Sequence, residues 1–190
     1  GPAGVGKTRF ALELCRQLAE EKDYTVLVIK NNNLQLYEDL VFAIEEGKDY
    51  LVLVDDANEL SGLHYVLDYL PRAAVKSPYI SKLILTVRDY ARKQVMQSVM
   101  DVIKPEIIQI TPFKDDDIRK LMKTCYGITN RIYTDRIVAI AEGNARLAML
   151  AGKLVVDSES IAAIQDASEL YHNYYSKQLR IFIESETSVS

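Results

Sequence analysis

The sequence predicts an α/β fold, a parallel sheet sandwiched by helices, followed by an all-helical lid. Three observations support this prediction. Apolar runs of strand length recur through the first 110 residues, and amphipathic helical patterns separate them. The runs do not alternate between apolar and polar residues, which is typical of parallel strands buried on both faces. Beyond residue 112 the sequence shows only helical patterns.

The elements of the first part follow one another as alternating strands and helices. Apolar runs rich in branched residues predict strands at 25–30, 49–56, 81–88 and 105–110. Helical spacing predicts helices at 8–22, 34–47, 60–71 and 89–103. Gly47 and Pro71 are the expected stop signals of the second and third helices. This alternation is what a parallel sheet with helical crossovers requires.

The second part contains four predicted helices, at 115–127, 131–143, 144–156 and about 160–182. Acidic residues in the first turn and a terminal glycine fit the first of them. Asn144 is a plausible N-cap of the third. The expected domains are 1–112 for the α/β part, 113–156 for the lid, and 157–190 for a C-terminal helix and linker to a further domain.

The composition indicates a globular protein and bears on whether it binds nucleic acid, a membrane or zinc. The chain is 48% hydrophobic and 26% charged, which is typical of a globular protein. Its net charge of −4 argues against a chain-wide nucleic-acid surface. The sequence has no apolar run of membrane-spanning length and no ligand-spaced histidines, so we expect a cytoplasmic chain without zinc. Cys15 and Cys125 are both expected to be buried and reduced.

The chain opens with Gly-x-x-x-x-Gly-Lys-Thr, the pattern of a phosphate-binding loop. Its glycines let backbone N–H groups surround phosphate oxygens, and the following helix contributes its positive end. Lys7 is expected to reach the β- and γ-phosphates, and the Thr8 hydroxyl to bind Mg²⁺. A chance glycine-rich turn is the alternative. The expected ATP or ADP contacts are Gly1, Pro2, Ala3, Gly4, Val5, Gly6, Lys7, Thr8 and Arg9.

Two acids end the strand predicted at 49–56. Ligands of open α/β sheets bind at the carboxyl ends of the strands, so Asp55 is expected to bind Mg²⁺. Asp56 is then placed to act as the general base that polarises the attacking water. A simple turn with a capping aspartate is the alternative for this pair.

Two arginines are further catalytic candidates. Arg88 ends the strand after Thr86, where it can sense the γ-phosphate or stabilise developing charge. Arg146 follows the break at Gly143 between two lid helices, so it can reach phosphate when the lid closes and couple nucleotide state to domain angle. For both residues, a solvated surface arginine is the alternative.

In this order, these motifs resemble those of the AAA+ superfamily of P-loop NTPases, and more closely its STAND branch of signal-transduction ATPases. The loop "GPAGVGKT" is similar to a Walker A motif, "LVLVDD" to a Walker B motif and "LILTVR" to a sensor strand. The turn "TPFK" leads into the lid, and "GNAR" falls on a Gly-x-Pro motif with Ala145 in place of proline. With this alanine, the segment is similar to the Gly-x-x-Arg sensor of initiator and clamp-loader AAA+ proteins, with Arg146 in the sensor position.

The resemblance implies a five-stranded core in which the strand before the phosphate loop is central. We therefore expect a longer parent chain with an apolar, β-branched strand upstream of Gly1. It also implies a switch that ADP holds closed and ATP opens for self-association, with slow hydrolysis. The trigger would be a protein ligand sensed by a neighbouring domain, and bacterial relatives of this type include antiphage sensors.

Three other functions remain open from the sequence. A DNA-acting AAA+ ATPase of the initiator or loader type would need a basic surface. A P-loop small-molecule kinase would usually carry an arginine-rich lid within the sheet topology, whereas this lid follows the last strand. A binder that holds nucleotide without hydrolysis is disfavoured by the presence of Lys7, Thr8, Asp55 and Asp56.

Overall fold

The computed structural model describes residues 2–30, 36–45, 47–76 and 81–158, and the chain forms two compact units. The α/β unit comprises Gly1–Pro2 and Gly6–Ile110. The helical unit comprises Ala3–Val5 and Thr111–Ser190. Each unit has its own core, and the helix expected at about 160–182 lies outside the described residues.

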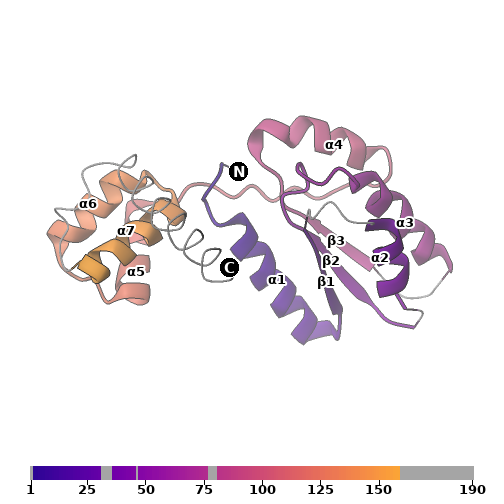
Figure 1. Ribbon diagram of the computed structural model, residues 1–190, viewed down its shortest axis with the longest axis horizontal. Coiled ribbons are helices and arrows are strands. Elements are labelled where there is room, and N and C mark those ends of the chain that lie inside the picture. The colour runs from indigo at the N-terminus through magenta and orange to yellow at the C-terminus, as the bar shows by residue number, and fades with distance from the viewer. Residues whose placement is uncertain (1, 31–35, 46, 77–80, 159–190) are drawn as a thin grey trace, which may run out of the picture. The chain divides into compact units, whose positions relative to one another are not determined.

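The α/β unit contains a parallel sheet of three strands in the order β1-β2-β3 (Figure 1). The strands are β1 (Thr25–Ile29), β2 (Tyr50–Val54) and β3 (Ser81–Leu85). Helices α2 (Leu36–Ala43) and α3 (Leu63–Lys76) lie between successive strands in the sequence, as parallel pairing requires. The predicted fold class is therefore confirmed.

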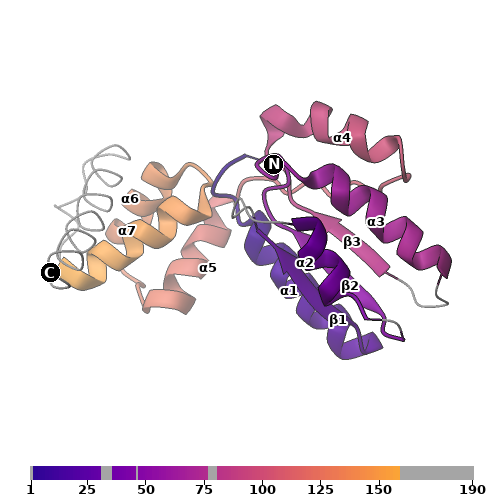
Figure 2. The same cartoon turned by 45° about the vertical axis from the view of Figure 1, so that its right-hand side comes forward.

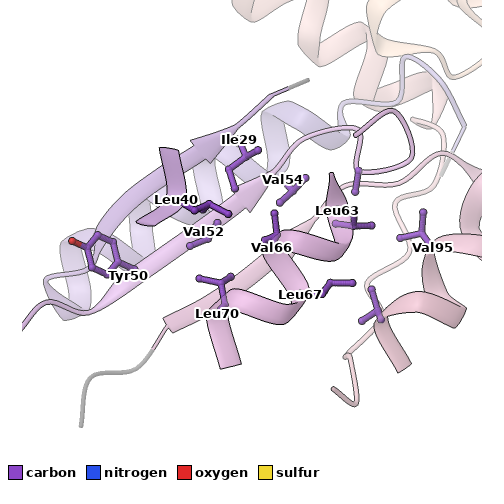
Figure 3. Packing of buried hydrophobic residues seen from close by; sticks show 12 residues of the cluster. Ile29, Leu40, Tyr50, Val52, Val54, Leu63, Val66, Leu67, Leu70 and Val95 are labelled. Atoms are coloured by element: carbon purple, nitrogen blue, oxygen red, sulfur yellow. The ribbon is translucent and has the colours of Figure 1, made fainter. Parts of the chain in front are cut away.

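The central strand β2 is buried along its whole length, and its residues alternate between two cores. Tyr50, Val52 and Val54 pack with α2, α3 and α4 (Arg92–Met100), which follows the short helix η1 (Asp89–Ala91) (Figure 3). Leu51 and Leu53 pack with α1 (Lys7–Lys22) on the opposite face. Figure 2 shows the sheet between these helices. Burial on both faces explains why the strand lacks a polar alternation.

The structure corrects the end of one predicted helix. The helix α3 continues through Pro71 to Lys76 instead of stopping at the proline. Proline has no backbone N–H, so position 71 gives up one helical hydrogen bond. Apolar contacts of the same helix compensate, since Val66, Leu67 and Leu70 are all buried in the sheet core.

The predicted strand at 105–110 forms no ladder with the described residues. Between this segment and β3 lies a cleft of about 490 Å³, which α1 and α4 also line. Its walls are mainly apolar and include Ala11, Ile84, Val99 and Ile110. The cleft thus separates segment 105–110 from β3. The strand expected upstream of the phosphate loop remains a prediction.

The helical unit packs α5 (Asp115–Tyr126), α6 (Arg131–Ala141) and α7 (Ala145–Ser158) around one apolar core. Ile118, Met122 and Ile137 are fully buried there. The Asn130 side chain caps α6 by accepting hydrogen bonds from the N–H groups of Ile132 and Tyr133. Among the described helices, none has both the length and the apolar character needed to cross a bilayer.

The two cysteines differ in exposure. Cys15 is buried between α1 and the sheet, and burial raises the pKa of its thiol. Cys125 is exposed, so the expectation of a buried second cysteine was wrong. The core of the helical unit receives Ile118 and Met122 from α5, and Cys125 lies off that buried face.

Candidate functional site

The polar residues expected at the site follow the carboxyl ends of β2 and β3. These ends meet at one edge of the sheet because the strands are parallel, and Val54 pairs in register with Leu85. Backbone hydrogen bonds continue past this pair, since the Thr86 N–H donates to the Val54 carbonyl at 3.0 Å. The buried sheet therefore holds the backbone of the following polar residues in place.

The Asp55 carboxylate joins the start of α1 to the end of β3. Its Oδ1 accepts hydrogen bonds from the hydroxyls of Thr8, at 2.8 Å, and Thr86, at 2.7 Å. The Thr86 hydroxyl also accepts a bond from the Asp56 N–H at 2.8 Å. Thr86 is only 6% exposed. One buried threonine thus fixes the Asp55 side chain and the Asp56 backbone together.

Thr8 and Asp55 provide the kind of ligands that Mg²⁺ prefers. Both offer hard oxygen atoms, and the ion usually takes one or two protein ligands and completes its shell with water and phosphate oxygens. The hydroxyl and the carboxylate already lie within hydrogen-bond distance of each other. The donor set therefore fits the metal expected from the sequence.

Asp56 and Arg88 form an ion pair at the same edge. The Arg88 Nη2 lies 3.0 Å from Asp56 Oδ2 and 2.8 Å from Glu59 Oε1. The hydrogen bonds that Arg88 donates to the Asp56 carboxylate raise the pKa of its guanidinium above the ordinary value. Asp56 also adopts a left-handed backbone conformation, with φ 48°, which is uncommon outside glycine. Asp56, the candidate base, is therefore paired with Arg88 in this structure.

Lys7 opens α1, and its ammonium group donates a hydrogen bond to the Pro2 carbonyl at 2.7 Å. The N-cap residue is Gly6, which has no side chain that could cap the helix. Such a helix start can offer its first N–H groups and its partial positive charge to an anion. Gly1 lies outside the described residues, and Arg9 is exposed on α1.

The helical unit contains the remaining candidate, Arg146, near the start of α7. Its side chain is exposed, while its backbone N–H donates to the Gly4 carbonyl at 3.0 Å. Gly143 lies against the turn before α5. The Phe113 N–H donates to the Gly143 carbonyl at 2.9 Å, and a Cβ on Gly143 would come within 2.7 Å of the Pro112 Cβ. The structure thus brings the "TPFK" and "GNAR" motifs together.

No family model and no curated protein matches the chain. The Thermotoga maritima RuvB Holliday junction branch migration motor is similar in structure, with a TM-score of 0.61 and 13% identity over 90% of this chain. Aeropyrum pernix Orc1 in complex with DNA matches with a TM-score of 0.60 and 16% identity over 93%. The chain has the AAA+ P-loop fold.

The chain spans 58% of the length of each of these two structures. Within the AAA+ fold, the α/β unit gathers Thr8, Asp55, Asp56 and Arg88 at one edge of its sheet. The catalytic and binding roles expected for these residues remain predictions.

Two further residues, Asn58 and Glu59, contribute to this edge of the sheet and were not expected from the sequence. Asn58 accepts a hydrogen bond from the Arg88 N–H at 3.1 Å, and Glu59 shares the Arg88 guanidinium with Asp56. Both follow the Asp55–Asp56 pair within one turn, so the recurrence of polar residues at 55, 56, 58 and 59 was the available signal. The sequence did not predict the local turn that brings these residues to Arg88.

Proposed function

We propose that this chain is the ATP-binding and slowly hydrolysing regulatory module of a STAND-type signalling ATPase. The observation that carries this proposal is the hydrogen-bonded set of Thr8, Asp55 and Thr86 on an AAA+ P-loop fold, in which Thr8 is the last residue of the phosphate-loop motif. A P-loop site needs this combination of a hydroxyl, a carboxylate and a helix start with a lysine. The ligands are then ATP or ADP with Mg²⁺.

Each residue has a proposed role at this site. Backbone N–H groups of the loop and the Lys7 ammonium bind the phosphates, and Thr8 and Asp55 hold Mg²⁺. The metal ion, when bound, neutralises charge that develops on the phosphate oxygens. Asp56 is the general base for the attacking water, and Arg88 and Arg146 stabilise charge on the phosphoryl group.

The ion pair between Asp56 and Arg88 supports slow turnover. In this state the Asp56 carboxylate faces two hydrogen bonds from Arg88, from Nε at 3.4 Å and from Nη2 at 3.0 Å. A carboxylate engaged in this way must exchange its arginine partner for water before it can act as a base. The same exchange would free Arg88 to bind the γ-phosphate, so one rearrangement would prepare both groups.

The regulatory part of the proposal rests on the resemblance of the motifs to STAND proteins. In this proposal, exchange of ADP for ATP changes the conformation and promotes self-association in response to a protein ligand sensed by a neighbouring domain. Antiviral defence in a bacterial cytoplasm is the setting that the resemblance suggests. Co-purified ADP, together with an ATP-dependent increase in mass by light scattering, would support this assignment, and a monomer that is insensitive to nucleotide would exclude it.

A DNA-acting AAA+ ATPase is the second candidate. Its support is that one structural neighbour is a Holliday junction motor and another was solved in complex with DNA. The net charge of −4 does not favour a large phosphate-binding surface. Hydrolysis measured with and without duplex DNA at low salt separates the candidates, because DNA stimulation is expected only for the second.

Alanine substitutions of two lysines in the same helix test whether the chain binds nucleotide. Lys7 lies in the first turn of α1 and Lys22 in its last, exposed turn. Lys7→Ala is expected to weaken ATP and ADP binding by about 100-fold, because it removes a charge-assisted hydrogen bond to phosphate. Lys22→Ala is expected to bind as the parent does. Isothermal titration with Mg²⁺ present measures both, and a parent chain that binds neither nucleotide would refute the proposal.

A further inference from the structure

The first residues of α7 contact the backbone of the phosphate loop within the helical unit. The Asn144 Nδ2 donates to the Ala3 carbonyl at 3.4 Å, and the Arg146 N–H donates to the Gly4 carbonyl at 3.0 Å. These residues are about 140 positions apart in the sequence, and all of them belong to the helical unit. Two consecutive loop carbonyls are thus held by the start of one helix.

Holding these carbonyls also fixes the direction of two loop N–H groups. A peptide group is planar and trans, so its C=O and N–H bonds point in opposite directions. The Ala3 carbonyl shares its peptide group with the Gly4 N–H, and the Gly4 carbonyl shares its group with the Val5 N–H. When α7 binds the two carbonyls, the N–H groups of Gly4 and Val5 must face away from α7. N–H groups presented on the inner side of such a loop are its phosphate ligands.

Asn144 packs closely against Gly4, and the backbone conformation there favours glycine. A Cβ built on Gly4 would come within 2.7 Å of both Cγ and Nδ2 of Asn144. Gly4 also has a φ of +77°, a conformation that side chains disfavour. The backbone conformation and the contact with Asn144 therefore both favour glycine at this position.

The same side chain begins helix α7. The Asn144 Oδ1 accepts hydrogen bonds from the N–H groups of Arg146, at 3.0 Å, and Leu147, at 3.1 Å. Its oxygen therefore acts as an N-cap while its nitrogen donates to the loop. Asparagine can serve both functions because its amide has an accepting oxygen and a donating nitrogen. Aspartate retains the accepting oxygen but has no donor.

We propose that Asn144 is a positioning residue for phosphate binding. Its side chain holds the Ala3 carbonyl directly and caps the start of α7, where the Arg146 N–H holds the Gly4 carbonyl, so that the Gly4 and Val5 N–H groups face away from α7. This inference rests on the proposed nucleotide site. It makes the start of α7 part of the phosphate-binding apparatus through backbone contacts, independently of the Arg146 side chain. A shift of α7 would then turn the loop N–H groups and change nucleotide affinity.

The test compares two N-cap asparagines of the helical unit. Asn130 caps α6 in the same way, since its Oδ1 accepts from the N–H groups of Ile132 and Tyr133, and these hydrogen bonds stay within its own helix. In the 190-residue chain, N144D keeps the cap, removes the donor to Ala3 and adds a negative charge beside the loop. The dissociation constants for Mg²⁺-ATP and Mg²⁺-ADP are expected to rise about tenfold or more in N144D and to stay unchanged in N130D.

Further measurements separate positioning from loss of folding. Circular dichroism and thermal midpoints should be alike for N130D and N144D, and KM for ATP should rise in N144D with kcat little changed. N144S provides a neutral cap whose hydroxyl is too short to reach Ala3, so its nucleotide binding should also weaken. Parent-like affinity in both N144D and N144S would overturn the inference while leaving the proposed nucleotide site intact. Absence of binding in the parent chain would instead refute the proposed site.

Discussion

The two units of this protein differ in how they hold the candidate site residues and the loop. In the α/β unit, side chains bind side chains, as Asp55 does with Thr8 and Thr86. In the helical unit, the contacts with the loop end on backbone carbonyls, those of Ala3 and Gly4. The difference separates two kinds of role. The proposed metal ligands and general base lie in the α/β unit, and the helical unit holds the peptide groups of Ala3 and Gly4.

The largest expected effect is a loss of ATP hydrolysis, and it tests whether the general base lies in the α/β unit. Asp56→Asn keeps the size of the side chain but removes its basicity. We expect ATP and ADP binding to persist while the hydrolysis rate falls by ~100-fold to ~10,000-fold, the usual contribution of a general base. Steady-state release of phosphate at saturating ATP measures the rate.

Asp68→Asn is the matched control, since Asp68 is exposed on α3 of the same unit. Arg88→Ala adds a second arm and is expected to weaken binding of ATP while leaving that of ADP unchanged, because only ATP offers a γ-phosphate. Hydrolysis at the parent rate in the Asp56 variant would show that this carboxylate is not the base.

A smaller effect is expected when either core is opened. Leu53 is fully buried between the sheet and α1, and Ile137 is fully buried among the three helices of the other unit. Truncation of either residue to alanine should lower the free energy of unfolding of its unit by about 3 kcal/mol. Hydrogen exchange read by mass spectrometry should show faster exchange confined to the unit that carries the substitution. Faster exchange throughout both units would show that their folding is coupled and would weaken the comparison.

The sequence was informative where a local rule applies. Uninterrupted apolar runs such as Tyr50–Val54 predicted buried parallel strands, and the pattern Gly-x-x-x-x-Gly-Lys-Thr at 1–8 predicted a loop followed by a helix. The contact between Asn144 and Ala3 could not be predicted, because nothing in either local pattern specifies a partner so distant in the chain. The extent of α3 beyond Pro71 depends on tertiary packing, which overrides a local stop signal.

The smallest expected effect concerns a surface cluster of the helical unit. Arg119 lies 2.9 Å from Asp135 and, with a smaller contribution from Arg131, lowers the pKa of the Asp135 carboxyl. A carboxyl whose pKa is lower in the folded state adds stability above its unfolded pKa and loses it as the pH falls through the folded value. Asp135→Asn should therefore slightly lower the thermal midpoint near pH ~7, with a difference that shrinks toward pH ~3.

Thermal unfolding followed by circular dichroism across this pH range measures both proteins. Asp157→Asn on α7 removes a second carboxyl of the same unit and serves as the comparison. A difference that stays constant from neutral to acid pH would show that the Asp135 charge is not what stabilises the unit.

The unequal exposure of the two thiols gives this protein a built-in reporter. Cys125 is exposed in the helical unit, and Cys15 is buried in the α/β unit with a thiol whose pKa is raised. A maleimide dye should therefore label the natural sequence at one position, without removing or adding a cysteine. Fluorescence from that dye would follow the helical unit as ATP, ADP or no nucleotide is supplied, in the unaltered chain.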